Sequence, residues 1–241
     1  MSDMQPLVDV DWLARQALGS VRIVDLRWSL SGPPALEKYR AGHIPGAVYV
    51  DMERDLSRHG GPGRHPLPPL EDFARVLGRI GAGSGTHVVV YDDGTGSVAA
   101  RMWFMLRVHG HERASVLDGG YAAWVKAGLP VTQEEPRLQP IDPPRLRLDR
   151  ARLVDRAGVA ALLSRRRDPG GPRALVMDAR APERYRGETE PVDKRAGHIP
   201  GAVNAPFASN LKEGRFRPPT ELRALYERLG ADRAAEFGES S

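Results

Sequence analysis

A nine-residue sequence, RAGHIPGAV, occurs twice in this chain of 241 residues, at residues 40–48 and again at residues 195–203. Self-similarity at a long period indicates a duplicated structural unit, and it constrains the fold more than any local propensity does. We therefore compare the residues on both sides of each copy.

The similarity extends beyond the nine residues. An apolar run ending in Asp-x-Arg precedes each copy, as IVDLR at 23–27 and VMDAR at 176–180. This pattern is typical of a buried parallel strand whose carboxyl end carries polar groups. Between these two motifs, EKYR at 37–40 matches ERYR at 183–186. The chain therefore contains one α/β unit in two copies.

Each copy continues with a predicted helix that opens after Pro-Pro and ends at Gly, over residues 67–82 and 217–231. The first copy then has a β-branched strand at 87–91, the loop DDGTGS at 92–97 and an apolar helix at 98–110. The sequences ASVLDGG and YAAWVKAG follow as a last strand, turn and helix. Strands alternating with helices favour a parallel sheet covered on both faces.

We predict an α/β fold with two domains of this kind. The first covers residues 1–131, a proline-rich linker covers 132–150, and the second covers 151–241. The second copy has few residues left after Ala231. By the template of the first copy, about 40 residues are expected to be missing from it, including the strand and loop that match 87–97. We therefore expect an incomplete second domain.

The composition excludes several classes of site. The chain has no cysteine, so its 241 residues form no disulfide, zinc–thiolate site or cysteine nucleophile. His109 and His111 have no carboxylate placed beside them, so we expect them at the surface or at a helix end and predict no metal site and no cofactor. No run approaches the 18 or so apolar residues that cross a bilayer. The N-terminus lacks an apolar signal region, and we expect a cytoplasmic protein with no membrane partner.

The net charge of +4 is spread along the chain. Its densest basic run, SRRRD at residues 164–168, favours a helix C-terminus over a phosphate-binding patch, because cations stabilise that end of the helix dipole. No aromatic residues are interleaved there to stack bases. We therefore predict no nucleic-acid partner.

The loop DDGTGS between a strand and a helix suggests an anion site. A Gly-rich turn that leads into a helix N-terminus directs several backbone N–H groups inward, and such a nest stabilises a negative charge. Asp92 and Asp93 stand at its mouth. A carboxylate there can accept the N–H bonds itself and repel an incoming anion. We expect the nest of the first copy to be filled by the chain and inert.

Together, Asp-x-Arg, AGHIPGA in both copies, VVVYDDGTGSVAARMWFML and LDGGYAAW resemble the tandem rhodanese-type sulfurtransferases, over about residues 7–231. Two-domain members act on thiosulfate or 3-mercaptopyruvate. The resemblance implies that the first domain is inactive, with Asp92 in the place of a nucleophilic cysteine. A cysteine in the loop of the second domain would carry the sulfane sulfur, and it matches no residue of this chain.

The family pattern D-x-R-x-x-x-R-[YF] maps onto DARAPERY, which makes Arg184 the substrate-binding candidate by resemblance. The implied partner is a small anionic sulfur donor.

The remaining polar candidates favour a structural role. His43 and His198 lie between Gly and Ile-Pro-Gly with no nucleophile beside them, which favours turn residues held by side-chain hydrogen bonds. An ion-pair and hydrogen-bond set is expected at each strand end, formed by Asp25 with Arg27 and by Asp178 with Arg180. Three aromatic residues are expected in the core: Trp103, Phe104 and Trp124.

The resemblance implies a sulfurtransferase that moves sulfane sulfur from thiosulfate or 3-mercaptopyruvate to a thiophile such as cyanide through a cysteine persulfide. Because this chain has no cysteine, we predict that it is inactive alone. Two alternatives stay open: a non-catalytic anion- or protein-binding module, and a gene fragment. The choice between the two donors, the physiological acceptor and the oligomeric state are not determined by the sequence.

Overall fold

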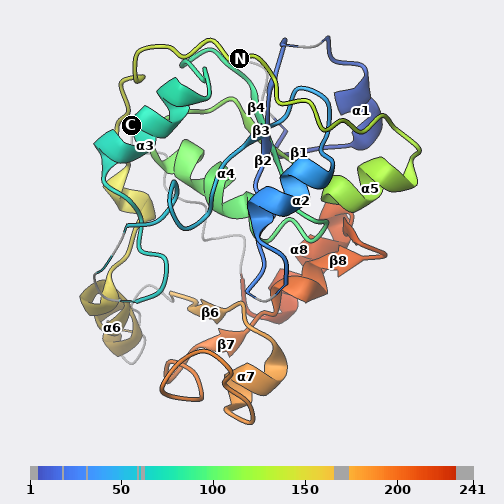
Figure 1. The fold of residues 1–241 in the computed structure, drawn as a ribbon. Coiled ribbons are helices and arrows are strands. Elements are labelled where there is room, and N and C mark those ends of the chain that lie inside the picture. The colour runs from blue at the N-terminus through green and yellow to red at the C-terminus, as the bar shows by residue number, and fades with distance from the viewer. Residues whose placement is uncertain are drawn as a thin grey trace. The chain divides into compact units, whose positions relative to one another are not determined.

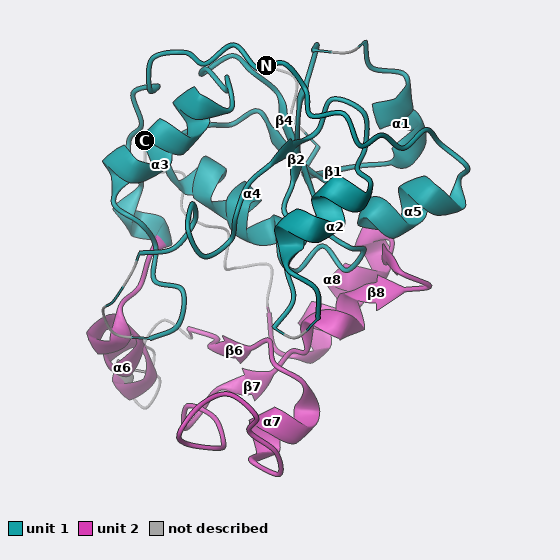
Figure 2. Cartoon of the chain, viewed as in Figure 1, with its two compact units in different colours: residues 1–152 teal, residues 153–241 magenta. Residues whose placement is uncertain are grey.

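The computed structural model describes residues 5–231 except 18, 31, 59, 61–62 and 166–173. The chain forms two compact units, residues 1–152 and residues 153–241 (Figure 2). Unit 1 contains all four tryptophans of the chain.

Unit 1 is built on a five-stranded sheet in the order β1-β5-β4-β2-β3, in which every pair of neighbours is parallel. Its strands are β1 (Leu7–Val8), β2 (Arg22–Asp25), β3 (Val48–Tyr49), β4 (Val88–Tyr91) and β5 (Ala114–Leu117). Its helices are α1 (Val10–Ala14), α2 (Ala35–Ala41), α3 (Leu70–Arg79), α4 (Ala99–Val108) and α5 (Gly120–Lys126). The parallel sheet and flanking helices predicted for this part of the chain are confirmed (Figure 1).

Alternate residues of the central strands face two hydrophobic cores. Val88 and Val90 of β4 pack in one core with residues of α3 and α4, whereas Val89 and Tyr91 pack in the other with residues of α1 and α5. Both faces of β4 are therefore covered, which explains why its sequence is an unbroken apolar run.

The strand order places a switch point between β2 and β4. From β2 the chain passes outward to the edge strand β3, and from β4 it passes outward to β5 on the other side. In open parallel sheets, ligands bind in the crevice beyond the carboxyl ends of the strands at such a point. The residues that follow β2 and β4 are therefore the first place to search for a site.

The proline-rich segment predicted as a linker is bonded to unit 1. The main chain of Thr132 pairs with that of His43, and the amide of Ile141 donates to the Gly78 carbonyl at 3.0 Å. Near its end, the amide of Asp149 donates to the Val108 carbonyl at 2.7 Å. The segment is anchored along much of its length, although it contains no strand or helix before the 3₁₀ turn η1 (Arg150–Arg152).

Unit 2 contains shorter elements. Its helices are α6 (Arg156–Arg165), α7 (Pro182–Arg186) and α8 (Pro219–Arg228), with a 3₁₀ turn η2 (Phe207–Asn210). Its strands are the parallel pair β6 (Met177–Asp178) and β7 (Val203–Asn204), and the antiparallel pair β8 (Leu211–Lys212) and β9 (Arg215–Phe216).

The opening elements of the two units have the same order: β6, α7, β7 and α8 follow one another as β2, α2, β3 and α3 do. The Pro-Pro signal is confirmed in both, since Pro69 caps α3 and Pro218 caps α8. The hairpin β8–β9 was not anticipated. Among the described residues, β6 pairs only with β7, whereas β2 pairs with both β3 and β4.

One expectation about the aromatic core was wrong. Phe104 is 37% exposed, because Met102, Met105 and Leu106 form the face of α4 that enters the core and Phe104 lies off that face. Trp124 is buried as predicted, and Trp103 is half-buried against the core.

His109 and His111 were expected at the surface or at a helix end; they lie at the C-terminal end of α4, and both are buried. Burial is possible because one ring nitrogen of each histidine lies within hydrogen-bond distance of a main-chain carbonyl. His109 Nδ1 is 2.6 Å from the Met105 carbonyl, and His111 Nε2 is 2.9 Å from the Thr86 carbonyl. The helix-end position expected for these two histidines is therefore confirmed, with His109 as the C-cap of α4.

No helix within the described ranges is long and apolar enough to cross a membrane. The basic run at 164–168 begins in the last turn of α6, but residues 166–168 lie outside the described residues.

Candidate functional site

The loop after β4 encloses the carboxylate of Asp92, which is 3% exposed. One carboxylate oxygen accepts the amides of Gly94 and Gly96, each at 2.9 Å. The other accepts the amides of Val98 at 3.0 Å and Ala99 at 3.2 Å, where α4 begins. Four N–H groups thus converge on one side chain, and the nest expected from the sequence is filled by the chain itself.

The Asp-Gly-Gly turn after β5 packs against this loop. The amide of Tyr121 donates to the Asp92 carbonyl at 2.9 Å. Gly120 has φ +53°, and a Cβ there would lie 2.5 Å from the same carbonyl oxygen. Only glycine fits such a close approach in that conformation. The LDGG motif is therefore explained by packing against the loop.

At the carboxyl end of β2, Asp25 and Arg27 form a buried pair with 0% and 4% exposure. The guanidinium donates to both oxygens of Asp25, at 2.7 Å for the shortest bond, and lies 4.1 Å over the ring of Tyr121. The Tyr91 hydroxyl donates to Asp25 at 2.7 Å. Burial and the Asp25 charge raise the pKa of Tyr91 well above its usual value, so the hydroxyl stays a donor.

The shared sequence forms the same contacts in both units. Tyr39 stacks on His43 with ring centroids 3.8 Å apart, and its hydroxyl donates to the Ala47 carbonyl. Tyr185 stacks on His198 at 3.7 Å, and its hydroxyl donates to the Ala202 carbonyl. In each case the histidine Nδ1 faces the carbonyl of the same tyrosine, at 2.8 Å and 2.7 Å. The structural role predicted for both histidines is confirmed.

The strand-end pair is repeated in unit 2 as well. Arg180 donates to both oxygens of Asp178 and to the Gly197 carbonyl, as Arg27 does to Asp25 and to Gly42. The hydrogen bond from Arg180 lowers the pKa of Asp178. Both strand-end sets are therefore confirmed as hydrogen-bonded ion pairs.

In each unit, the residue before the tyrosine that stacks on the histidine (Tyr39 or Tyr185) carries the candidate cation. In unit 1 that residue is Lys38, whose ammonium lies 3.0 Å from Asp93 in the loop after β4. In unit 2 it is Arg184. The contact in unit 1 thus shows that a cation at this helix position can reach the loop that follows the next strand of the sheet.

Arg184 is held by two acidic residues of its own unit. Its guanidinium donates to Glu190 at 2.6 Å and lies 3.4 Å from Asp193. Glu190 is 5% exposed in its side chain and also contacts Arg180 at 3.3 Å. The hydrogen bond from Arg184 and the amide of Asp193 lower the pKa of Glu190 to about 2. A carboxylate of the chain therefore occupies the space between the two guanidinium groups.

Unit 1 also contains a carboxylate–imidazole pair that sequence reasoning missed. His65 Nε2 lies 3.6 Å from Glu53, and Trp28 donates to the same carboxylate at 3.2 Å while its ring meets His65 edge-on. His65 has φ +49°, which is uncommon for a residue other than glycine. Only the strained backbone distinguishes the pair, and the sequence gives no sign of that.

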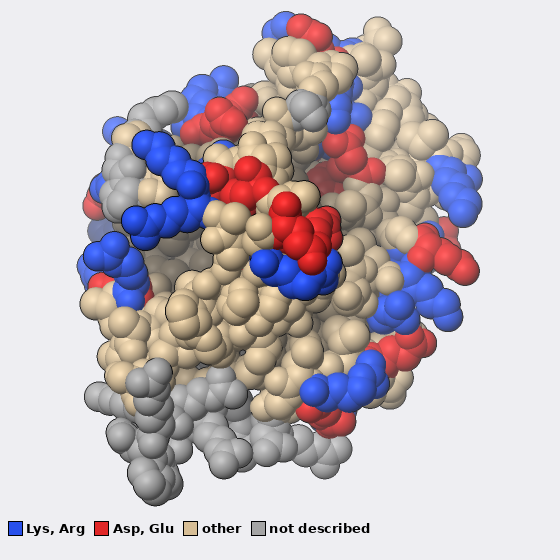
Figure 3. All heavy atoms as spheres, turned by 90° about the horizontal axis from the view of Figure 1, so that it is seen from below, with Lys and Arg blue, Asp and Glu red and all other residues tan. Residues whose placement is uncertain are grey.

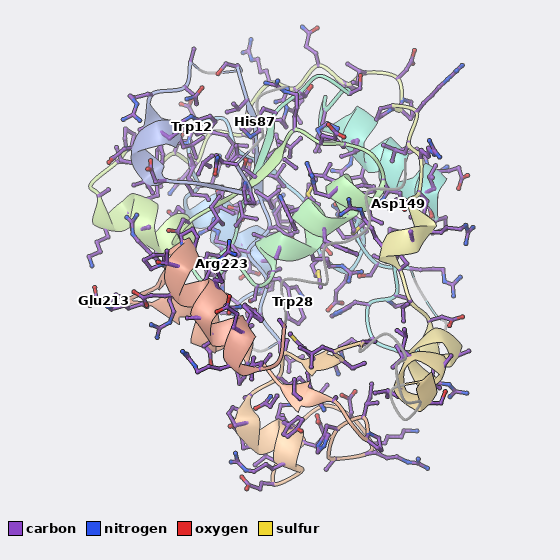
Figure 4. The ribbon with its side chains drawn as sticks, turned by 180° about the vertical axis from the view of Figure 1, so that it is seen from behind. Trp12, Trp28, His87, Asp149, Glu213 and Arg223 are labelled. Carbon is purple, nitrogen blue, oxygen red and sulfur yellow. The ribbon has the colours of Figure 1, made fainter. Side chains whose placement is uncertain are left out.

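A second histidine of unit 1, His87, is paired with a buried hydroxyl group. His87 Nε2 lies 2.9 Å from the Ser115 hydroxyl, which bonds to the Gln5 carbonyl at 2.6 Å. Trp12 covers the ring of His87, with centroids 5.3 Å apart (Figure 4). Burial lowers the pKa of His87. Ser115 is 0% exposed, so the role of this pair is structural.

Among the described residues, no group of three or more histidine and acidic side chains is placed to hold a metal ion. On the face drawn in Figure 3, basic side chains occur in separate groups bordered by acidic ones.

Comparison with known proteins gives consistent matches along the chain. A family model described as a rhodanese-like domain matches residues 9–127. The "Probable 3-mercaptopyruvate sulfurtransferase" of Pseudomonas aeruginosa is 42% identical over 235 residues, which cover 95% of this chain and 80% of that protein. The thiosulfate sulfurtransferase of Cricetulus griseus is 39% identical over 235 residues, with coverages of 92% and 76%.

Among solved structures, SseA from Escherichia coli, described as a 3-mercaptopyruvate sulfotransferase with the rhodanese fold, matches with a TM-score of 0.83 at 31% identity. The match covers 95% of this chain and 85% of that one. The similarity therefore includes both units of the chain.

Proposed function

Since the chain belongs to the rhodanese family, we propose that it serves sulfane-sulfur transfer, with thiosulfate or 3-mercaptopyruvate as the donor. In this proposal unit 1 is an inert copy and unit 2 holds the donor anion. The helices and strands of residues 153–231 include β6, α7, β7 and α8 in the order of the opening elements of unit 1, and in this proposal they belong to a second domain of the same kind. The cytoplasmic location expected from the sequence is part of the same proposal.

The observation that carries the inert role of unit 1 is the Asp92 carboxylate. It occupies the four amides that would otherwise stabilise an anion or a thiolate at this loop. A donor anion entering here would meet a fixed negative charge instead of free donors. Asp92 thus takes the position that the family assigns to the nucleophile and cannot form a sulfane adduct.

Arg184 is the group we propose to bind the donor. Thiosulfate and the carboxylate of 3-mercaptopyruvate are anions with oxygen acceptors, which a guanidinium binds through paired N–H bonds. Glu190 now satisfies those donors at 2.6 Å. The donor must therefore displace Glu190 from Arg184, or bind to guanidinium hydrogens that Glu190 leaves unused.

The sulfur step itself needs a thiolate. In transfer through a persulfide, the thiolate attacks the terminal sulfur of thiosulfate, and sulfite leaves with the electron pair of the S–S bond. With 3-mercaptopyruvate it attacks the thiol sulfur, and pyruvate leaves as its enolate with the electron pair of the C–S bond and takes up the proton of the thiol. The 241 residues contain no cysteine to carry this sulfur. We therefore propose that the chain binds a donor but does not turn it over alone, and a non-catalytic anion-binding module is the second candidate function.

Isothermal titration calorimetry with thiosulfate and with 3-mercaptopyruvate tests the donor site. We expect Arg184→Gln to weaken binding at least about tenfold, which corresponds to the loss of one charge-assisted contact. Arg186→Gln is the matched control, because this exposed arginine of the same helix pairs only with Glu188 in the described structure. Equal weakening in both variants, or no effect of Arg184→Gln, would contradict the assignment.

Glu190→Gln should change the affinity for the donor in the opposite direction. Removing its charge leaves Arg184 less well paired, so the variant is expected to bind the donor more tightly than the wild type. Weaker donor binding in this variant would show that Glu190 positions Arg184 for the donor instead of competing with it.

A further inference from the structure

Unit 1 has a concave surface rich in arginine, apart from the loop at Asp92. This surface, of about 490 Å³, lies between the chain after β3 and the helix α3. Its charged lining consists of four arginines and two aspartates, Arg54, Arg58, Arg75, Arg79, Asp55 and Asp72. None of these residues takes part in the site at Asp92 or at Arg184.

A buried carboxylate fixes two of the arginines. Asp55, which is 9% exposed, accepts Arg54 at 2.9 Å and Arg79 at 2.7 Å, and also accepts the amide of Asp51. Burial by itself raises the pKa of Asp55, but the bonds from Arg54 and Asp51 and the Arg79 charge outweigh it and lower the pKa overall. The carboxylate stays ionised and holds both guanidinium groups at the rim of the surface.

The side chains of the other two arginines, Arg58 and Arg75, are held less firmly. The Arg58 guanidinium makes no hydrogen bond or ion pair with the part of the chain that the structure describes, and its main chain is anchored by a bond from its amide to the Pro66 carbonyl at 2.9 Å. Arg75 pairs with Asp72 one helical turn away, and both side chains are exposed. Exposed pairs of this kind contribute little stability, so Arg75 can exchange Asp72 for a stronger anion.

We propose that this surface, the Arg54–Arg79 cradle, binds inorganic polyphosphate. Guanidinium groups are suited to phosphate because their planar N–H pairs match its oxygens. The volume lies in the range of small-molecule sites and exceeds what one tetrahedral anion needs, so several linked phosphates fit best.

A nucleotide is less suitable for the cradle. The described lining contains no aromatic side chain on which a base could stack, and its apolar part is limited to Pro68 and Val76. The recognition is therefore directed at phosphate groups alone.

The test is a titration of the full chain with tripolyphosphate at physiological ionic strength, by isothermal titration calorimetry. Arg58→Ala combined with Arg75→Ala should weaken binding at least about tenfold, because two charge-assisted contacts are lost. Arg137→Ala combined with Arg145→Ala is the matched control, since it removes the same charge from exposed positions of unit 1 outside the cradle. This control should change the affinity less than about twofold. The single variant Arg58→Gln keeps Asp72 paired, and we expect intermediate weakening.

Saturable binding of tripolyphosphate that is lost in the cradle variant and kept in the control supports the proposal. Equal losses in the two double variants would show that net charge alone attracts the anion and would overturn it. Absence of saturable binding at physiological ionic strength would overturn it as well. Tighter binding of ATP than of tripolyphosphate would contradict the assignment to inorganic polyphosphate. Because the titration involves neither Arg184 nor a sulfur donor, its outcome is independent of the proposed function.

Discussion

Replacing Asp92 by Asn should destabilise unit 1 strongly. The carboxylate has two acceptor oxygens, each serving two amides. An asparagine can satisfy one of these pairs with its oxygen, but its NH₂ group then faces the other pair of N–H donors. Two buried or half-buried donors lose their acceptor in either orientation of the amide.

The magnitude follows from those two donors. Leaving a buried donor unsatisfied costs about 1–3 kcal/mol. Gly96 and Ala99 are buried, whereas Gly94 and Val98 are reached in part by water. Each orientation therefore leaves one fully buried donor and one hydrated donor unpaired, for a loss of about 3 kcal/mol. In a unit of this size that loss lowers Tm by about 6–12 °C.

Urea unfolding followed by tryptophan fluorescence measures this loss, because all four tryptophans lie in unit 1. Asp93→Asn is the matched control. It removes a neighbouring charge whose partner, Lys38, is partly exposed, so it should cost about 1 kcal/mol or less. If Asp92→Asn costs no more than Asp93→Asn, the four amides are not stabilised by this carboxylate and the filled-nest account fails.

Three further predictions follow from the same contacts. Gly120→Ala should destabilise unit 1 by about 2–4 kcal/mol in the same assay, because its Cβ meets the Asp92 carbonyl, whereas Gly128→Ala, with a similar φ and open space, should cost about 1–2 kcal/mol. The Glu190 carboxylate has a pKa lowered from 4.5 to about 2, so its stabilising pairs are complete above about pH 4.5 and are lost as the pH falls toward 2; an NMR titration of its carboxyl carbon that reports an ordinary midpoint would contradict this. Limited proteolysis should leave a resistant fragment that ends near Arg152, since unit 2 has few buried residues in its described part, and equal resistance of the second unit would refute that view.

The fold of unit 1 was well predicted, because the sequence signals for its helices and strands are local. Pro-Pro fixes the start of α3 and α8, and a short unbroken β-branched run favours a strand buried on both faces, as β4 is. The nest at Asp92 was predictable for the same reason, since Gly spacing and a following helix dictate where the amides lie.

The features that were missed depend on contacts distant in sequence or on orientation. No pattern indicates that Glu190 reaches Arg184, because loop conformation decides which acidic residue pairs with it. The exposure of Phe104 depends on which side of α4 faces the sheet, and an apolar helix leaves that open. The sequence also did not indicate which residues the proline-rich segment contacts, and main-chain bonds such as that from the Ile141 amide to the Gly78 carbonyl attach it to unit 1.

The central claim is that unit 1 holds a preformed anion nest filled by its own carboxylate, in a chain with no cysteine to carry sulfur. Cyanide-dependent formation of thiocyanate from thiosulfate and from 3-mercaptopyruvate tests it most directly, measured on the purified 241-residue chain and on its Asp92→Cys variant. The wild-type chain should give no rate above the protein-free background, and the variant should form a persulfide at its new thiol, since the four amides stabilise a thiolate. Wild-type turnover in proportion to protein concentration, or a variant thiol with no reactivity toward either donor, would contradict the account.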